Sequence, residues 1–258
     1  MLLFTVLIVL LCAPTPADLV VGDFPNLFPL GKGPQKRISE RPQIEMYKAA
    51  VDINVGVPSA EGDKPLDVNI KATFLMRNRE AEETTLPVSY LYPLLPESGK
   101  MEGFAVVSNK ERKKVELDQK AAPQYFWMET FKPREERLIQ VEYVLRVPRQ
   151  SQQELEKRRG VEGIFELISP KTDYFIFEYS LTSGATWEGP ITKETVRLHF
   201  SDTWTPQTVL CNQAGRLKQE NPSLWVYELK DEKPAQDLHF ALPAGPATSP
   251  DTSAAEHA

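Results

Sequence analysis

The chain has 258 residues, of which 41% are hydrophobic and 26% are charged, and its formal net charge at pH 7 is −6. This composition is that of a folded globular protein rather than a disordered one. Interspersed charges with an acidic excess argue against a nucleic-acid-binding protein, which normally has a basic face or tail. The 22 prolines favour many loops and edge strands over long helices.

The N-terminal segment 1–17 has the pattern of a secretory signal peptide. Its apolar stretch 2–11 has no charged side chain and is too short to span a bilayer as a helix, which takes about 20 residues. Thr15 and Ala17 are small residues spaced as a cleavage site before Asp18 requires. We expect an exported chain, periplasmic or extracellular, with no transmembrane span after cleavage. An uncleaved N-terminal anchor is the alternative.

Cysteine usage follows from that expectation. Cleavage removes Cys12 and leaves Cys211 as the one cysteine of the mature chain, so no intramolecular disulfide can form. A lone thiol in an exported protein is either buried or pairs with another chain. The apolar, strand-like surroundings of Cys211 in "QTVLC" favour burial.

The mature chain begins with an extended lead-in, 18–42, that is rich in proline, glycine and charge. Period-2 alternation then predicts strands, most clearly over 66–78. Two hairpins follow, one with a polar turn at 108–111 and one over 122–147 with its turn in "KPREE". The apolar faces of these strands are made by Val68, Ile70, Ala72, Phe74, Met76, Leu86, Val88, Tyr90 and Tyr92, and by Ile139, Val141, Tyr143, Leu145 and Val147.

A short helix is predicted over 149–160, where the strand pattern stops. Ser151 and Glu154 have the spacing of a capping box, in which each side chain binds the other residue's backbone N–H. Gly160 can end this helix in the left-handed conformation.

The predicted fold is all-β, with two β-sandwich-like segments packed together and joined by that helix. The first segment is 43–148 and the second is 161–242, where strand patterns resume at regular spacing. The last residues, 243–258, are mostly proline, alanine, serine, threonine and acid, which predicts a flexible tail.

The sequence assigns no catalytic, cofactor-binding or metal-binding residue. Strand alternation directs His199 and His239 to solvent, and His257 lies in the tail. A Gly-x-Ser-x-Gly elbow and a phosphate-binding glycine loop are absent. Basic clusters at 110–114 and 157–159 alternate with acids, which indicates a solvated surface. The carboxylates of a glycosidase can lie far apart in sequence, so that chemistry stays open.

The tryptophans are the remaining candidates for binding. Trp127 and Trp225 lie in strand patterns and are expected in the core. Trp187 and Trp204 are left open, because an exposed tryptophan could stack on a sugar ring or form a binding hot spot.

The stretch "SGATWEGPI" combines several of these features. Gly184 permits a backbone turn that other residues resist, and Trp187 can fold over the open end of a sandwich. Gly189 and Pro190 fix the re-entry of the chain into a strand at Ile191. A structural corner is a sufficient explanation, and a binding loop is the alternative.

The longer stretch "EYSLTSGATWEGPITKETVRLHF" resembles a segment, Leu-Thr-Thr-Gly-Ala-x-Trp-x-Gly-Pro-Ile, of a bacterial family of exported proteins, the domain of unknown function numbered 4424. "METFKPREERLIQVEYVLRV" and "DEKPAQDLHFAL" are similar to further pieces of that family, and the likeness spans most of 46–242. Ser183 replaces a threonine, and a cysteine that could pair with one like Cys211 is missing from 161–182. The resemblance implies a β-rich cell-envelope protein with no established reaction.

Three classes of function stay open on these grounds. We favour an exported, non-enzymatic interaction or structural module whose partner is another envelope protein or a glycan. One alternative is a hydrolase of glycans or peptides that uses scattered acidic residues. The other is a sugar-binding protein that uses an exposed Trp187 or Trp204.

Overall fold

A computed structural model of the chain describes residues 26–27, 43–59, 64–91, 99–118, 124–156, 168, 172–201, 204 and 208–244. The fold is all-β, as predicted. The expected signal peptide lies outside the described residues, as do most of the lead-in and of the tail. None of the helices in the described ranges is long and apolar enough to cross a bilayer.

Eight strands form one large sheet with the order β14-β15-β12-β2-β3-β9-β5-β6. Neighbours are antiparallel except β12 and β2, which are parallel, so strands from both predicted segments share this sheet. The strands are β2 (Ile44–Val55), β3 (Leu66–Asn78), β5 (Lys100–Ser108), β6 (Glu111–Arg112), β9 (Glu136–Val147), β12 (Ile191–His199), β14 (Leu217–Asn221) and β15 (Leu224–Glu232).

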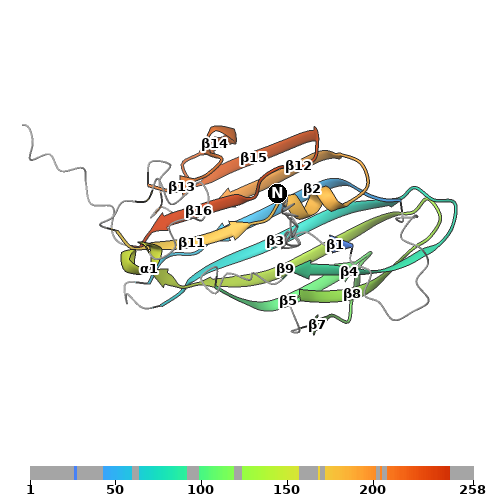
Figure 1. Ribbon diagram of the computed structural model, residues 1–258, viewed down its shortest axis with the longest axis horizontal. Helices are drawn as coiled ribbons and strands as arrows, with labels where there is room; N and C mark the ends of the chain where they lie inside the picture. The colour runs from blue at the N-terminus through green and yellow to red at the C-terminus, as the bar shows by residue number, and fades with distance from the viewer. Residues whose placement is uncertain are drawn as a thin grey trace, which may run out of the picture.

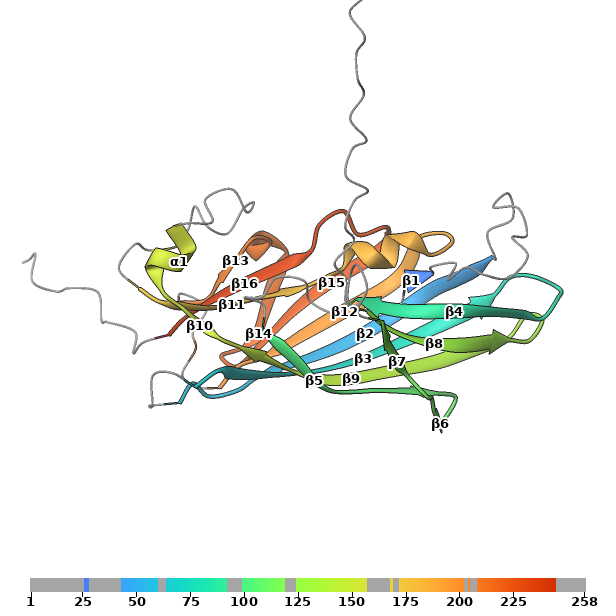
Figure 2. The same cartoon turned by 60° about the horizontal axis from the view of Figure 1, so that its bottom comes forward.

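Two four-stranded antiparallel sheets lie along the large one, toward opposite ends (Figures 1 and 2). The β8 sheet has the order β1-β4-β8-β7, with strands β1 (Asn26–Leu27), β4 (Thr84–Leu91), β7 (Glu116–Asp118) and β8 (Gln124–Phe131). The β11 sheet has the order β10-β11-β16-β13, with strands β10 (Arg149–Gln150), β11 (Tyr174–Tyr179), β13 (Leu210–Cys211) and β16 (Leu238–Pro243).

The alternation in the sequence explains these layers. The predicted apolar faces of 66–78 and 139–147 are buried, each side chain at most 4% exposed. They belong to one core that also contains the inner side chains of both small sheets. The opposite face of the large sheet is charged, with ion pairs such as Lys71–Glu142 and Arg77–Glu136, both at 2.7 Å. Both small sheets therefore cover the same face of the large sheet.

The two predicted hairpins have different outcomes. The first is confirmed, because Ser108 pairs with Glu111 across a turn in which Asn109 and Lys110 have positive φ. The second is wrong, because β8 pairs with β4 and β7, whereas β9 pairs with β3 and β5. The turn between them carries the chain from one layer to the other. Their apolar faces meet through the core instead of lying side by side in one sheet.

The predicted helix is present and starts later than residue 149, while residues 157–160 lie outside the described residues. It is α1 (Gln152–Glu156), preceded by β10. The capping box is confirmed, since the Ser151 N–H donates to Glu154 Oε2 at 2.9 Å and the Glu154 N–H donates to Ser151 Oγ at 3.4 Å. Gly160 lies outside the described residues.

Candidate functional site

The corner expected from "SGATWEGPI" joins β11 to β12 through the short 3-10 helix η2 (Thr182–Thr186). Within it, the Gly184 N–H donates to Leu181 O at 2.9 Å. The Glu188 N–H then donates to Ile44 O at 3.2 Å, which fastens the corner to the start of β2. Trp187 is 1% exposed and belongs to the core.

Asp237 caps this corner from a distant part of the chain. Its Oδ1 accepts hydrogen bonds from Ser180 Oγ at 2.9 Å and from the Thr182 N–H at 2.7 Å. Its Oδ2 accepts one from Thr182 Oγ1 at 3.2 Å. A carboxylate at a helix start satisfies backbone N–H groups that have no partner inside the helix.

Lys233 completes the same arrangement. Its Nζ donates to the carbonyl oxygens of Ala185 at 3.2 Å and Trp187 at 3.3 Å. Lys233 and Asp237 both belong to "DEKPAQDLHFAL", so two separate segments of the family resemblance meet in space. These contacts hold the corner to a segment that lies far from it in the sequence.

The individual corner residues have distinct roles. Gly184 is buried in η2, and the positive φ, +70°, occurs at Gly189 instead. Space does not require glycine there, because a Cβ on Gly189 would meet nothing within 4 Å. Pro190 is exposed, and Ile191, 1% exposed, begins β12 opposite Glu232. The sequence pattern predicts the special backbone conformation at Gly184, whereas the structure has it five residues later, at Gly189.

All four tryptophans are buried. Trp127 and Trp225 lie in the core, as predicted. Trp187 and Trp204, the two left open by the sequence, are 1% and 4% exposed. The indole N–H of Trp204 donates to Gly56 O at 3.4 Å. Neither ring therefore offers a free face on which a sugar could stack.

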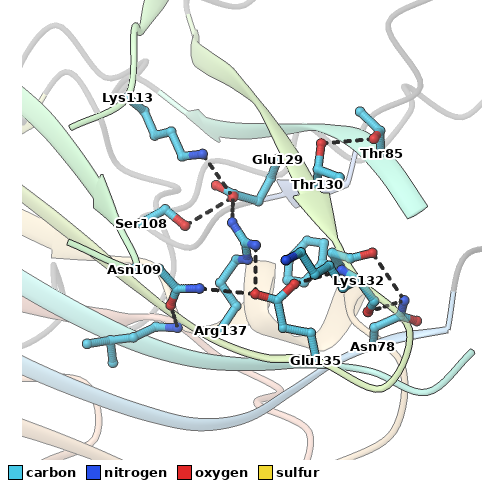
Figure 3. Close-up of polar contacts among 12 residues, drawn as sticks. Asn78, Thr85, Ser108, Asn109, Lys113, Glu129, Thr130, Lys132, Glu135 and Arg137 are labelled. Atoms are coloured by element: carbon cyan, nitrogen blue, oxygen red, sulfur yellow. Dashed lines mark hydrogen bonds and ion pairs between the residues drawn. The ribbon is translucent and has the colours of Figure 1, made fainter. Parts of the chain in front are cut away.

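A second arrangement, which the sequence analysis missed, surrounds Glu129 between the β8 sheet and the large sheet (Figure 3). Glu129 is fully buried. Oε1 accepts from Ser108 Oγ at 3.0 Å, and Oε2 accepts from the Trp127 indole N–H at 3.1 Å. Arg137 and Lys113 add ion pairs at 2.5 Å and 3.1 Å. The expectation that Lys113 is a solvated surface residue is wrong, since its side chain is only 20% exposed.

A second carboxylate supports this cluster. Glu135 Oε1 accepts from Arg137 Nη2 at 2.7 Å and from Asn109 Nδ2 at 3.1 Å (Figure 3). Its Oε2 accepts from the Lys132 N–H at 2.7 Å. Two carboxylates and two cations balance in charge, and Glu129 has a donor on each oxygen. Such a cluster fixes one sheet on the other.

Glu194 on β12 is the opposite case. Its side chain is fully buried, and neither carboxyl oxygen has a hydrogen-bond partner among the described residues. Burial raises its pKa from the ordinary 4.5 to about 8. The proton is therefore held at neutral pH. No sequence motif marks this position.

The thiol and the two described histidines have separate polar neighbours. Cys211 is 3% exposed, which confirms its predicted burial, and burial raises its pKa to about 11. His199 Nε2 lies 3.5 Å from Asp52, and His239 Nε2 lies 3.2 Å from Glu178. His199 reaches solvent as expected, whereas the side chain of His239 is only 21% exposed. The described ranges hold no group of three metal-ligating side chains.

Comparison with known proteins identifies a fold and no family. No family model matches the chain, and no curated protein matches it. A candidate nutrient-binding protein from Legionella pneumophila superposes with a TM-score of 0.58 at 14% identity, covering 86% of this chain and 70% of that one. This likeness shows a shared fold.

Two enzyme structures match less well. The M1 zinc metallopeptidase from Deinococcus radiodurans has a TM-score of 0.37 at 14% identity, over 78% of this chain and 42% of that one. Native yeast LTA4 hydrolase has a TM-score of 0.41 at 12% identity, over 81% of this chain and 31% of that one. The chain spans less than half of either enzyme.

Proposed function

We propose that the chain is an exported, non-enzymatic β-sandwich module that binds another envelope protein through the outer face of its β8 sheet. Export rests on the signal-peptide pattern of 1–17. Membership of the family numbered 4424 is part of the proposal and rests on the quoted segments, two of which meet at Asp237 and Lys233.

The observation that carries the proposal is exposed apolar surface. Among the described residues, three large hydrophobic side chains are exposed, and two of them belong to the β8 sheet. Met128, 55% exposed, alternates with the buried Trp127 and Glu129 and so points outward, beside Pro87 on β4. Leu117, 39% exposed, lies on the edge strand β7 opposite Tyr125, and so on the inner side of the sheet. Phe126, which is half-buried, shares the outer side with Met128. Apolar groups gathered on one outer face, here Met128, Pro87 and Phe126, favour a protein interface.

The outer face of the large sheet has a different character. Its charges pair with one another, as in Lys71–Glu142 and Arg146–Glu102, the latter at 2.8 Å. Polar groups that satisfy each other across strands stabilise a sheet and leave little to gain from a partner. This difference in character indicates that the partner binds the outer face of the β8 sheet rather than that of the large sheet.

The test compares two single substitutions that each introduce one negative charge. Met128→Asp alters the proposed interface, and Asn69→Asp alters the exposed outer face of β3. Tagged, exported protein is recovered from its native envelope, and co-purified proteins are quantified. We expect one near-stoichiometric partner for the wild-type chain and for Asn69→Asp. For Met128→Asp we expect a loss of about tenfold or more, as for a hot-spot residue.

Equal recovery of the same proteins by all three chains would contradict the proposed interface. The non-enzymatic part is tested separately with purified protein on cell-envelope glycans and peptides. Turnover that a single point substitution abolishes, in a variant with unchanged unfolding, would show an enzyme instead.

A further inference from the structure

Glu194 occupies the interior of the large sheet, on a strand flanked by β2 on one side and β15 on the other. Its cross-strand neighbours are Ala49 and Leu229, which are both buried and apolar. Its two carboxyl oxygens are shielded and have no hydrogen-bond partner among the described residues. A buried polar group without a partner is uncommon in folded proteins and calls for a physical explanation.

The strands around Glu194 supply acids and apolar groups to this core rather than cations. The titratable residues of this core in the described ranges are Tyr90, Tyr143, Tyr179, Cys211 and Tyr227. Tyr227 lies on β15, next to β12, whereas Tyr179 on β11 and Cys211 on β13 belong to the β11 sheet. Burial raises the pKa of Tyr227 and of the Cys211 thiol. The inner residues of β16 are apolar.

The basic residues nearest in sequence are engaged on the other face of the sheet. Lys193 Nζ lies 3.7 Å from Glu228, and Arg197 Nη1 lies 3.8 Å from Asp52. The raised pKa of Glu194 has burial as its sole cause, so no charge in the described structure offsets the desolvation of its carboxylate. Ionised Glu194 would be an unpaired charge inside the core.

We propose that Glu194 is a pH-sensitive element that keeps the β11 sheet packed on the large sheet while protonated and loosens that packing when it ionises. The inference is independent of the proposed binding role. The carboxyl keeps its proton in the folded state and loses it in the opened state at a lower pH. The opening equilibrium constant therefore rises about tenfold per pH unit between about pH 4.5 and pH 8, and then levels off.

Cys211 provides a direct readout, because this buried thiol of the β11 sheet reacts only after opening. The rate of disulfide-exchange labelling is measured in a Cys12→Ser background from about pH 5 to pH 9. Glu194→Gln keeps the side-chain shape without the titrating proton, and Glu220→Gln makes the same change at an exposed position of β14. The wild-type labelling rate is divided by the variant's rate at the same pH. This ratio removes the pH dependence of the thiol's own reactivity, which is common to both chains.

We expect the ratio of wild-type to Glu194→Gln labelling to rise about tenfold per pH unit up to about pH 8, while the ratio to Glu220→Gln stays flat. A flat ratio for both variants would overturn the proposal. If Glu194→Gln does not fold, infrared spectroscopy of the wild-type chain decides. The proposal requires a protonated carboxyl C=O band at about pH 6.5 that disappears through about pH 8, and a band already missing at pH 6.5 would contradict it.

Discussion

At the scale of single residues, the molecule contains two fully buried glutamates in opposite situations. Glu129 lies among donors and cations, with Arg137 and Lys113 both within 3.1 Å. Glu194 has no such partner among the described residues and retains its proton. Both occur as single acids within strand patterns, as "WMETF" and "TKETV". The difference arises from residues distant in sequence that the fold brings to Glu129.

Glu129→Ala tests whether the cluster around Glu129 holds the β8 sheet on the large sheet. Removing the carboxylate leaves Arg137 and Lys113, whose side chains are only 12% and 20% exposed, without their common partner. We expect a loss of about 3–5 kcal/mol in the free energy of unfolding, measured by denaturant titration. Ser108→Ala removes one donor and should cost about 1–2 kcal/mol. If Glu129→Ala lowers the free energy of unfolding no more than Ser108→Ala does, the cluster does not hold the two sheets together.

At the scale of elements, the corner between β11 and β12 shows how a local motif depends on distant residues. The pattern of Gly189, Pro190 and Ile191 predicted a turn into a strand, and β12 begins at Ile191. The hydrogen bonds from Lys233 and to Asp237 could not be predicted from the local pattern, because both residues follow β12 and β15 in the sequence.

Gly189→Ala tests the backbone of this corner. The φ of +70° costs an L-residue about 1–2 kcal/mol, although the added methyl group meets nothing within 4 Å. We expect a destabilisation of that size in thermal or denaturant unfolding. Gly215→Ala is the matched control, since a Cβ there also meets open space but φ is not in the left-handed region. Equal effects of the two changes would show that the corner backbone is not strained for alanine.

Strand alternation predicts which face of a strand is buried better than it predicts which strands pair. The strand predicted over 66–78 has those bounds, and its apolar face is buried. The same alternation could not tell whether β8 and β9 lie side by side or face each other through the core, because both arrangements bury Trp127 and Ile139. Core contacts made by residues far apart in sequence decide between them. The cluster around Glu129 could not be predicted either, because its members are also far apart in the sequence.

At the scale of the whole molecule, the parallel pairing of β12 with β2 joins the two predicted segments. Val196 lies opposite Val51, and Leu198 opposite Ile53, in the middle of the large sheet. One core extends under both small sheets. Parallel neighbours require a long connection, which here includes most of the chain.

This arrangement predicts that the segment 43–148 does not fold alone. Without the rest of the chain, β2 loses its partner β12, and the part of the core under the β11 sheet becomes exposed. We expect weak near-UV circular dichroism and no cooperative unfolding transition for 43–148, against a single transition for 43–244. A cooperative transition of the short fragment, with native-like near-UV signal, would contradict the prediction.

The central claim is that the outer face of the β8 sheet binds a protein partner. The most direct measurement places a photo-crosslinking amino acid at position 128 of the exported chain, with a second chain carrying it at position 69, and irradiates the native envelope. We expect one dominant adduct from position 128 and none of it from position 69. Adducts that are equal from both positions, or absent from position 128, would contradict it.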